Sequence, residues 1–515
     1  MKHTKKLASL LLALALAFAL AIPAFAEGET YSITINNATP GHTYEAYQMF
    51  TGDLAEKDGK KVLSNIVWGS GISEAGKTAL GNAADKAKTL TTEADAKAFA
   101  KEVAPYLTTA AGSANTVTDG KYVISGLAAG YYLVKDQDGS LTGDADAYTE
   151  YIVKVVSNTN ATPKSSVPQV EKKVKDTNDS KDTTATDWQD SADYDIGDSV
   201  PFQLKATLAD NVSSYTTYKV VFHDTLSKGL TLDATYGADT TVASGVTVKI
   251  DSTDKTSCFT ITAKKDADGT TTLTISCDDV KALGAGNSSV ITVEYTATLN
   301  TDAVVGSSGN SNKVKLEYSN NPNKSETGNT ETGNTPEDTV IVFTYKVIIN
   351  KVDGDKKPLT GAEFTLEKKI RGDNPTTQEV TETEYWKSIA VVKTNDGTTC
   401  TFAGLDDGDY RLTETKTPAG YNTIAPIAFT ITATHDSTSA NPALNSLAGN
   451  ATSGEITFTP STNDGSLSAD VVNKSGATLP ETGGMGTTLF YVLGGVLVVG
   501  AVVLLITKKR MGAEQ

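Results

Sequence analysis

Short runs of alternating apolar and polar residues occupy most of the chain between its two ends. The runs are rich in Val, Ile, Thr, Tyr and Phe, and turn residues separate them, as in YSITINNATPG, YIVKVVSN, TVKIDSTD and SSVITVEYTATLN. A period of two is typical of strands that bury one face, and regular turn signals between such runs favour antiparallel β-sandwiches. We therefore predict a mainly β chain of tandem immunoglobulin-like sandwiches.

One stretch near the N-terminus departs from this alternation. The section from Glu74 to Tyr106 is rich in Ala and Lys and has helical character. Strand-like runs lie on both sides of it, so the section interrupts a β domain rather than preceding one. We predict a helical insertion in the first sandwich.

The strand-like pattern is interrupted at two places, which divide the chain. The segment 158–169 holds two prolines, which cannot continue a strand ladder. The segment 325–338 repeats Glu-Thr-Gly-Asn-Thr, which is typical of a linker. A length of 515 residues suits about three domains. We predict sandwiches over residues 27–165, 166–325 and 336–475, with a linker over residues 326–335.

Two longer apolar runs mark the ends of the chain. The first, residues 7–22, follows a Lys-rich head and precedes Ala-Phe-Ala, which predicts a secretory signal peptide over residues 1–26. The second, Leu489–Ile506, approaches the ~20 residues that cross a bilayer as a helix. The basic residues after it favour the cytoplasmic side. Residues 476–515 therefore hold a membrane anchor, and the sandwiches lie outside the cell.

Net charge and cysteine content argue against two classes of protein, those that bind nucleic acid and those that a disulfide framework stabilises. A formal net charge of −17 argues against nucleic acid as a partner, because phosphates demand basic clusters. Three cysteines are too few for a disulfide framework. Cys258 and Cys277 lie at equal distances from a predicted turn at 266–269, so a disulfide and two separate small buried side chains are both open. Cys400 has no evident partner in the sequence.

Ordinary catalytic chemistry has no support in the sequence. None of the four histidines stands in an HExxH motif or beside a nucleophile elbow. The Asp-rich segments 176–182 and 353–357 lack the glycine and terminal glutamate of a calcium loop, and acidic turns explain them better. We expect no turnover enzyme, no cofactor and no metal.

Strand parity places two lysines on apolar faces. In PQVEKKVKD, Lys172 shares a face with Val170 and Val174, and Asn312 lies on the apolar face of a later strand. A buried amine or amide without partners is costly. Condensation of the two side chains to an isopeptide bond, with loss of ammonia, removes both costs. The reaction requires a neutral amine and a protonated acid, both of which an apolar site favours.

The same parity applies in the last domain. Lys351 shares a face with Val347 and Ile349, and Glu414 shares one with Tyr410 and Leu412. Solvated lysine and glutamate side chains normally avoid such a face. The pattern therefore predicts a second buried lysine with an acid beside it.

The C-terminal segment resembles the cell-wall sorting signal of Gram-positive surface proteins. It consists of LPETG, an apolar span and a basic tail in that order. The resemblance implies that a sortase cleaves between Thr482 and Gly483 and transfers Thr482 to an amine. Pro480 stiffens the extended substrate. The motif comprises Leu479, Pro480, Glu481, Thr482 and Gly483.

Other segments resemble sortase-assembled backbone pilins. NATPKSSVPQ resembles their pilin motif, which implies that Lys164 accepts Thr482 of the next subunit, although Thr162 stands where the family often has an aromatic residue. An ordinary exposed linker lysine is the alternative. YKVVFHDTLSKGLTL resembles the fimbrial isopeptide-forming domain, which implies Asp224 as the acid for Lys172 and Asn312, with Glu294 as runner-up.

The last domain resembles the CnaB type through INKVDGDKKPLTGAEFTL, YRLTETKTPAGY and ADVVNKSG. This resemblance implies a bond between Lys351 and Asn473 that Glu414 promotes. The first domain has Lys135 and Asp136 where the corresponding acid would stand, so we expect no bond there.

Taken whole, the chain resembles a major pilin of the SpaA type. The resemblance implies a structural, cell-wall-anchored shaft subunit on the bacterial surface that supports adhesion and makes its isopeptide bonds autocatalytically. The alternative is a monomeric anchored adhesin that binds a host matrix protein or glycan. The implied partners are pilus-specific and housekeeping sortases, further copies of the chain, accessory pilins, peptidoglycan and host surface receptors.

Overall fold

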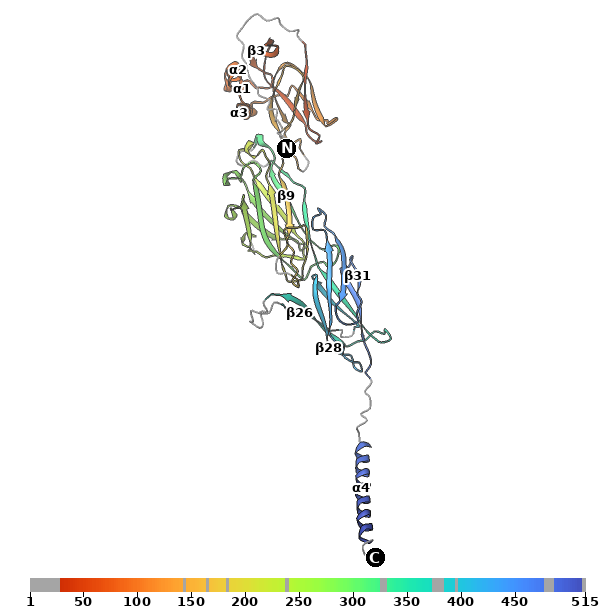
Figure 1. The fold of residues 1–515 in the computed structure, drawn as a ribbon. Coiled ribbons are helices and arrows are strands. Elements are labelled where there is room, and N and C mark those ends of the chain that lie inside the picture. The colour runs from red at the N-terminus through yellow and green to blue at the C-terminus, as the bar shows by residue number, and fades with distance from the viewer. Residues whose placement is uncertain are drawn as a thin grey trace.

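The computed structural model describes residues 28–141, 145–163, 166–181, 185–236, 240–324, 331–372, 384–393, 397–476 and 486–511. Three β-sandwiches follow one another along a long axis, and an apolar helix stands at the C-terminal end (Figure 1). The predicted signal peptide, Lys164 and the motif Leu479–Gly483 lie outside the described residues. The prediction of a mainly β, tandem-sandwich chain is confirmed.

The first sandwich packs a sheet of order β5-β1-β8 against one of order β3-β2-β6-β7, with β4 on β2. Helices α1, α2 and α3 and the 3-10 helix η1 lie between β3 and β4, which confirms the helical insertion. Ser73, Asn82 and Thr92 each cap a helix through the side-chain oxygen. The elements are β1 Tyr31–Asn36, β2 Tyr44–Lys57, β3 Lys60–Trp68, α1 Glu74–Leu80, α2 Ala83–Thr89, α3 Glu93–Val103, η1 Ala104–Tyr106, β4 Gly112–Ala114, β5 Lys121–Leu127, β6 Gly130–Asp136, β7 Glu150–Val155 and β8 Thr159–Ala161.

The middle sandwich packs a sheet of order β17-β16-β20-β11-β9 against one of order β10-β23-β21-β12-β19-β18, with β13 on β20 and β22 on β21. Its strands are β9 Gln169–Val174, β10 Ser191–Asp193, β11 Ser199–Thr207, β12 Val220–Leu226, β13 Leu230–Leu232, β14 Thr235–Tyr236, β15 Val242–Ser244, β16 Val246–Ile250, β17 Thr253–Asp254, β18 Thr260–Lys265, β19 Thr271–Cys277, β20 Val290–Leu299, β21 Asn310–Ser319, β22 Thr332–Asn334 and β23 Asp338–Phe343. Its 3-10 helices are η2 Val212–Ser214, η3 Thr256–Cys258, η4 Lys281–Leu283 and η5 Pro322–Lys324.

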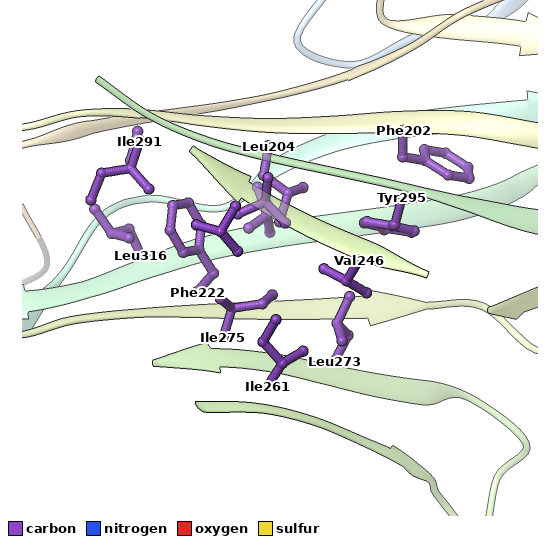
Figure 2. Close-up of a cluster of buried hydrophobic side chains, with 14 of the residues drawn as sticks. Phe202, Leu204, Phe222, Val246, Ile261, Leu273, Ile275, Ile291, Tyr295 and Leu316 are labelled. Carbon is purple, nitrogen blue, oxygen red and sulfur yellow. The ribbon is translucent and has the colours of Figure 1, made fainter. Parts of the chain in front are cut away.

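The core of the middle sandwich lies between these two sheets. Leu204 of β11, Phe222 of β12 and Ile275 of β19 gather there, with Phe202 farther along β11 (Figure 2). Each of these side chains is fully buried, and each follows the period of two along its strand. The alternation seen in the sequence is therefore the alternation of core and surface.

The last sandwich packs a sheet of order β27-β24-β32-β31 against one of order β26-β25-β28-β29-β30. Strands β24 and β32, the first and last of this sandwich, are parallel neighbours. The strands are β24 Tyr345–Asp353, β25 Glu363–Arg371, β26 Glu384–Lys393, β27 Thr399–Leu405, β28 Gly408–Lys416, β29 Ile427–His435, β30 Leu444–Ala451, β31 Thr459–Ser461 and β32 Ser466–Asn473.

The connection between the middle and last sandwiches differs from the predicted linker over residues 326–335. Strands β22 and β23 both hydrogen bond to β21, so the middle sandwich extends to Phe343 instead of ending near residue 325. The last sandwich begins at Tyr345. Thr344, which is fully buried, is thus the only residue between the two domains. Turn-rich composition marked this stretch of the sequence but carried no information about the sheet that β22 and β23 join.

The C-terminal helix α4, Gly486–Met511, is apolar along most of its length. Its segment Leu489–Lys509 has 21 residues, a mean hydropathy of 2.8 and none of its most apolar stretch buried against the rest of the protein. A helix of this length spans the hydrocarbon core of a bilayer. The predicted anchor helix is therefore present.

Replacing Phe222 by Ala should lower the free energy of unfolding of the middle sandwich by about 3–5 kcal/mol, because the change leaves a cavity between two sheets. Denaturant titration of the purified protein measures this difference. Val304→Ala is the matched control, since Val304 is 38% exposed in the same sandwich and its truncation leaves no cavity. Equal denaturation midpoints for the two variants would contradict the placement of Phe222 in the core.

Two buried lysine sites as the candidate functional site

The first site lies between the two sheets of the middle sandwich. Lys172 on β9 and Tyr295 on β20 come from one sheet, and Asp224 on β12 and Asn312 on β21 come from the other. Lys172, Asp224 and Asn312 are fully buried, and Tyr295 is 4% exposed. The structure therefore brings together the lysine, acid and amide that the sequence predicted.

The hydroxyl of Tyr295 connects the three predicted side chains. It accepts from Lys172 Nζ at 3.0 Å and from Asn312 Nδ2 at 2.8 Å, and it donates to Asp224. Lys172 Nζ also donates to Asp224 Oδ1. Asn312 Oδ1 has no hydrogen-bond partner among the described residues. The amide carbonyl is thus left without a hydrogen-bond donor in a buried site that holds an amine and an acid.

Burial shifts both titratable groups of this site toward their neutral forms. It lowers the pKa of Lys172 to about 8, although the nearby Asp224 carboxylate acts in the opposite direction. It also raises the pKa of Asp224 above its usual value, against the effect of Lys172. A neutral amine is a nucleophile and a protonated carboxyl group is a proton donor, so these shifts favour acyl transfer.

The second site lies in the core of the last sandwich. Lys351 on β24 donates from Nζ to Val471 O at 2.8 Å and to Asn473 Oδ1. Asn473, the last residue of the neighbouring strand β32, donates from Nδ2 to the two oxygens of Glu414 at 3.0 and 3.1 Å. Lys351 and Asn473 are fully buried, and Glu414 is 5% exposed.

Glu414 reaches this pair from β28, in the opposite sheet. Its Oε2 also accepts from the backbone N–H of Ile424 at 3.2 Å, and its Oε1 lies 4.0 Å from Lys351 Nζ. Burial lowers the pKa of Lys351 to about 8. The three side chains again place an amine, an amide and an acid within contact of one another.

Both arrangements supply the parts of one condensation. The amine nitrogen can attack the side-chain carbonyl carbon of asparagine, and the carboxyl group can polarise that carbonyl and carry a proton to the departing ammonia. Because the fold holds the amine, the amide and the acid close together in the core, the reaction does not need the bimolecular encounter that it would need in water.

The runner-up acid, Glu294, does not face Lys172. It accepts from Gln203 Nε2 at 2.8 Å and pairs with Lys249 Nζ at 3.3 Å, on the outer face of the sheet. Tyr295, which follows it on β20, points into the core instead. Sequence reasoning missed Tyr295, although the period of two that places Lys172 inside also places Tyr295 inside.

The first sandwich has a different buried pair at the corresponding place. Lys135 binds Asp138 at 2.9 Å near the surface, whereas Asp136 is buried and lies 2.7 Å from Nδ1 of His42. Burial opposes charge on the imidazole, but hydrogen bonds with Asp136 and Asp146 raise the pKa of His42 to about 9. In the first sandwich the buried side chain that carries a positive charge is therefore a histidine, His42, whereas in the other two sandwiches the buried amines belong to lysines.

The three cysteine thiols are free in the structure. Cys258 is exposed at the end of η3, Cys277 is partly buried at the end of β19, and Cys400 is buried in the last sandwich. The predicted hairpin between β18 and β19 is present, but no disulfide crosses it.

Three segments of the chain match described protein families. Residues 196–322 match the Gram-positive pilin backbone subunit 2, Cna-B-like domain. Residues 345–442 match SpaA, a prealbumin-like fold domain, and residues 471–511 match the LPXTG cell wall anchor motif. The chain belongs to the backbone pilins of Gram-positive bacteria. It is anchored to the cell wall by a sortase and exposed on the cell surface.

Individual proteins are also similar to this chain over most of its length. The chain is 26% identical over 437 residues to the trypsin-resistant surface T6 protein of Streptococcus pyogenes serotype M6, covering 72% of this chain and 74% of the relative. The T6 backbone pilin structure, which is described as a modular three-domain structure, matches with a TM-score of 0.55 at 19% identity, covering 88% of this chain and all of that one. The major pilin SpaD of Corynebacterium diphtheriae matches with a TM-score of 0.47 at 17% identity, covering 87% of this chain and 98% of that one.

The lowered pKa of Lys172 predicts a pH dependence in the backbone pilin variant Asn312→Ala, in which the amine has no amide to attack. The unfolded lysine titrates near 10.4, and the folded one near 8, so the unfolded chain binds more protons between these values. The free energy of unfolding should therefore rise with pH from about 8 to about 10. Denaturant titrations across this range measure it.

The control for this experiment is the double variant Asn312→Ala, Lys172→Met. It lacks the Lys172 amine, so its stability should rise with pH by less than that of the single variant over the same range. Parallel pH profiles for the two variants would show that Lys172 titrates normally in the fold.

Proposed function

We propose that this backbone pilin is the shaft subunit of a covalently polymerised pilus and that two internal isopeptide bonds strengthen it. The observation that carries the proposal is the repeated burial of a lysine, an asparagine and an acid in one site. The Tyr295 hydroxyl joins the three side chains in the middle sandwich, and they contact one another directly in the last one. A single buried lysine has many explanations. Two sites in one surface protein that each combine a lysine, an asparagine and an acid are explained by the same condensation to an isopeptide bond.

Each bond forms in one balanced step. The neutral Nζ of Lys172 attacks the side-chain carbon of Asn312, a new amide C–N bond forms, and the original C–NH₂ bond breaks. The proton released by Nζ passes through Asp224 to the leaving nitrogen, which departs as ammonia. Lys351, Asn473 and Glu414 react in the same way, and no external reagent takes part.

The two bonds connect different parts of their sandwiches. The bond from Lys172 to Asn312 bridges the two sheets, because β9 and β21 belong to opposite sheets. The bond from Lys351 to Asn473 joins the first and last strands of one sheet, where they already run parallel. Each closes a loop of more than a hundred residues, which by the loop-entropy model disfavours the unfolded state by about 4–5 kcal/mol.

Polymerisation would use the two ends of the ectodomain. A sortase forms an acyl intermediate at Thr482 and transfers it to Lys164 of the next subunit, which gives open-ended, head-to-tail growth. The match of residues 471–511 to the LPXTG anchor motif supports the donor end. The acceptor rests on the sequence around Lys164 alone. A role of the shaft in adhesion is inferred from the resemblance to the family and belongs to this proposal.

Intact-mass analysis of the purified ectodomain should give the sequence mass less two ammonia molecules. Asp224→Ala and Glu414→Ala should each restore one ammonia, because each removes the acid from one site. Glu294→Ala is the control and should leave both losses in place, since Glu294 points away from Lys172. A wild-type chain of full sequence mass would refute both bonds.

Immunoblots of cell-wall extract boiled in detergent test the polymer separately. The wild type should give a ladder of high-mass species, and Lys164→Ala should give monomer only. Lys173→Ala, which alters a lysine at the edge of the middle sandwich, should leave the ladder unchanged. Monomer in the wild type would favour the anchored adhesin, and a ladder that survives in Lys164→Ala would assign the acceptor role to another lysine.

A further inference from the structure

The condensation in the middle sandwich needs a route for a proton from the attacking amine to the leaving amide nitrogen. Attack by Lys172 leaves a surplus proton on Nζ, and the nitrogen of Asn312 departs only after it has gained one. Asp224 can take up the first proton, since Lys172 Nζ donates to its Oδ1. Among the described residues, however, no hydrogen bond joins Asp224 to Asn312, so the second transfer has no direct route.

The hydroxyl of Tyr295 lies between the acid and the amide. It donates to Oδ2 of Asp224, the carboxyl oxygen that Lys172 does not contact, and it lies 2.8 Å from Nδ2 of Asn312. It also lies 3.0 Å from Nζ of Lys172. One hydroxyl group therefore touches the acid and both of the nitrogens between which the proton moves.

The surroundings of Tyr295 suit it to this position. Its ring stacks on that of Phe202, with the ring centroids 5.6 Å apart, which fixes the direction of the hydroxyl. Burial raises the pKa of Tyr295 well above its usual value, and the neighbouring Asp224 acts in the same direction. The hydroxyl therefore keeps its proton at neutral pH. Because a hydroxyl both donates and accepts, it can take up one proton and release another without a change of charge.

We propose that Tyr295 is a catalytic residue of the condensation in the middle sandwich, where its hydroxyl transfers a proton from Asp224 to the leaving nitrogen of Asn312. This role rests on the proposed function, because it concerns one step of the same reaction. It gives the two oxygens of the carboxyl group separate tasks, since one faces the amine and the other faces the tyrosine.

The transfers balance. The lone pair of Lys172 Nζ forms the new C–N bond, and one Nζ proton passes to Oδ1 of Asp224. The proton already on Oδ2 of Asp224 passes to the oxygen of Tyr295, whose own proton passes to Nδ2 of Asn312. The C–Nδ2 bond breaks with its electron pair on nitrogen, and ammonia departs. Asp224 and Tyr295 end as a neutral acid and a neutral phenol, as they began.

The last sandwich passes its proton without a tyrosine. Its acid, Glu414, accepts directly from Nδ2 of Asn473 at 3.0 and 3.1 Å. Its Oε1 also lies 4.0 Å from Nζ of Lys351. The acid thus reaches the leaving nitrogen itself. The last sandwich therefore serves as an internal reference for experiments on the middle one.

The rate of bond formation in Tyr295→Phe tests the proposal. Ectodomain chains are made in a cell-free reaction, translation is stopped, and samples quenched over time are analysed by intact mass and by their linked peptides. The variant keeps the ring against Phe202 but lacks the hydroxyl. The bond of the middle sandwich should therefore form about a hundredfold more slowly than in the wild type. The bond of the last sandwich should form at the wild-type rate.

Tyr218→Phe is the matched control. Tyr218 is another buried tyrosine of the middle sandwich, 1% exposed, and no described hydrogen bond joins it to the three reacting side chains. This variant should form both bonds at the wild-type rate. A wild-type rate for the middle bond in Tyr295→Phe, or equal slowing in both tyrosine variants, would overturn the role of Tyr295. A wild type that never forms the middle bond would instead refute the proposed function, and this role with it.

A proton inventory on the wild type gives an independent test if Tyr295→Phe fails to fold. The rate of bond formation in the middle sandwich is measured in mixtures of H₂O and D₂O. Because the relay moves several exchangeable protons together, the rate should fall along a curve as the fraction of deuterium rises. A straight-line dependence would mean that a single proton moves, and it would overturn the relay through Tyr295.

Discussion

A lysine amine enclosed in a β-sandwich is the constraint on which the rest of this structure depends. An ammonium group loses its hydration there, so it must become neutral or find a fixed counter-charge. Lys172 and Lys351 lie beside amides and have pKa values lowered to about 8. Lys368 lies among carboxylates that raise its pKa above the usual value, although burial acts in the opposite direction. The same side chain is a potential nucleophile in two places and a stable cation in the third.

The neighbours that decide this outcome were predictable to different degrees. Strand parity alone placed Lys172 and Lys351 in the core, because the period of two survives in short alternating segments. Parity also places Lys368 beside Phe364 and Leu366 on the buried face of β25. Its counter-charge from Asp195 was not predictable, since that residue belongs to another sandwich and lies far away in the sequence.

The domain boundary illustrates the same limit. Gly, Asn and Thr near residue 330 marked an interruption in the strands, but an interruption within a sandwich and one between sandwiches have the same local composition. The pairing of β23 with β21 and β10 assigns residues 338–343 to the middle domain. Prediction of the middle site met the same limit. Parity places Glu294 and Tyr295 on opposite faces of β20, but it does not reveal that the Tyr295 hydroxyl hydrogen bonds with the amine, the acid and the amide.

Thr344 has a consequence for any filament built from this chain. A flexible linker of the predicted length would spread its ends over roughly 15–20 Å, whereas one residue advances the backbone by about 3.8 Å. Thr344 is also held, since its hydroxyl donates to Leu405 O at 3.1 Å and its carbonyl accepts from Gly306 N–H at 3.1 Å. Little angular error can arise at such a joint, so the persistence length of the filament is governed by the junctions elsewhere along it.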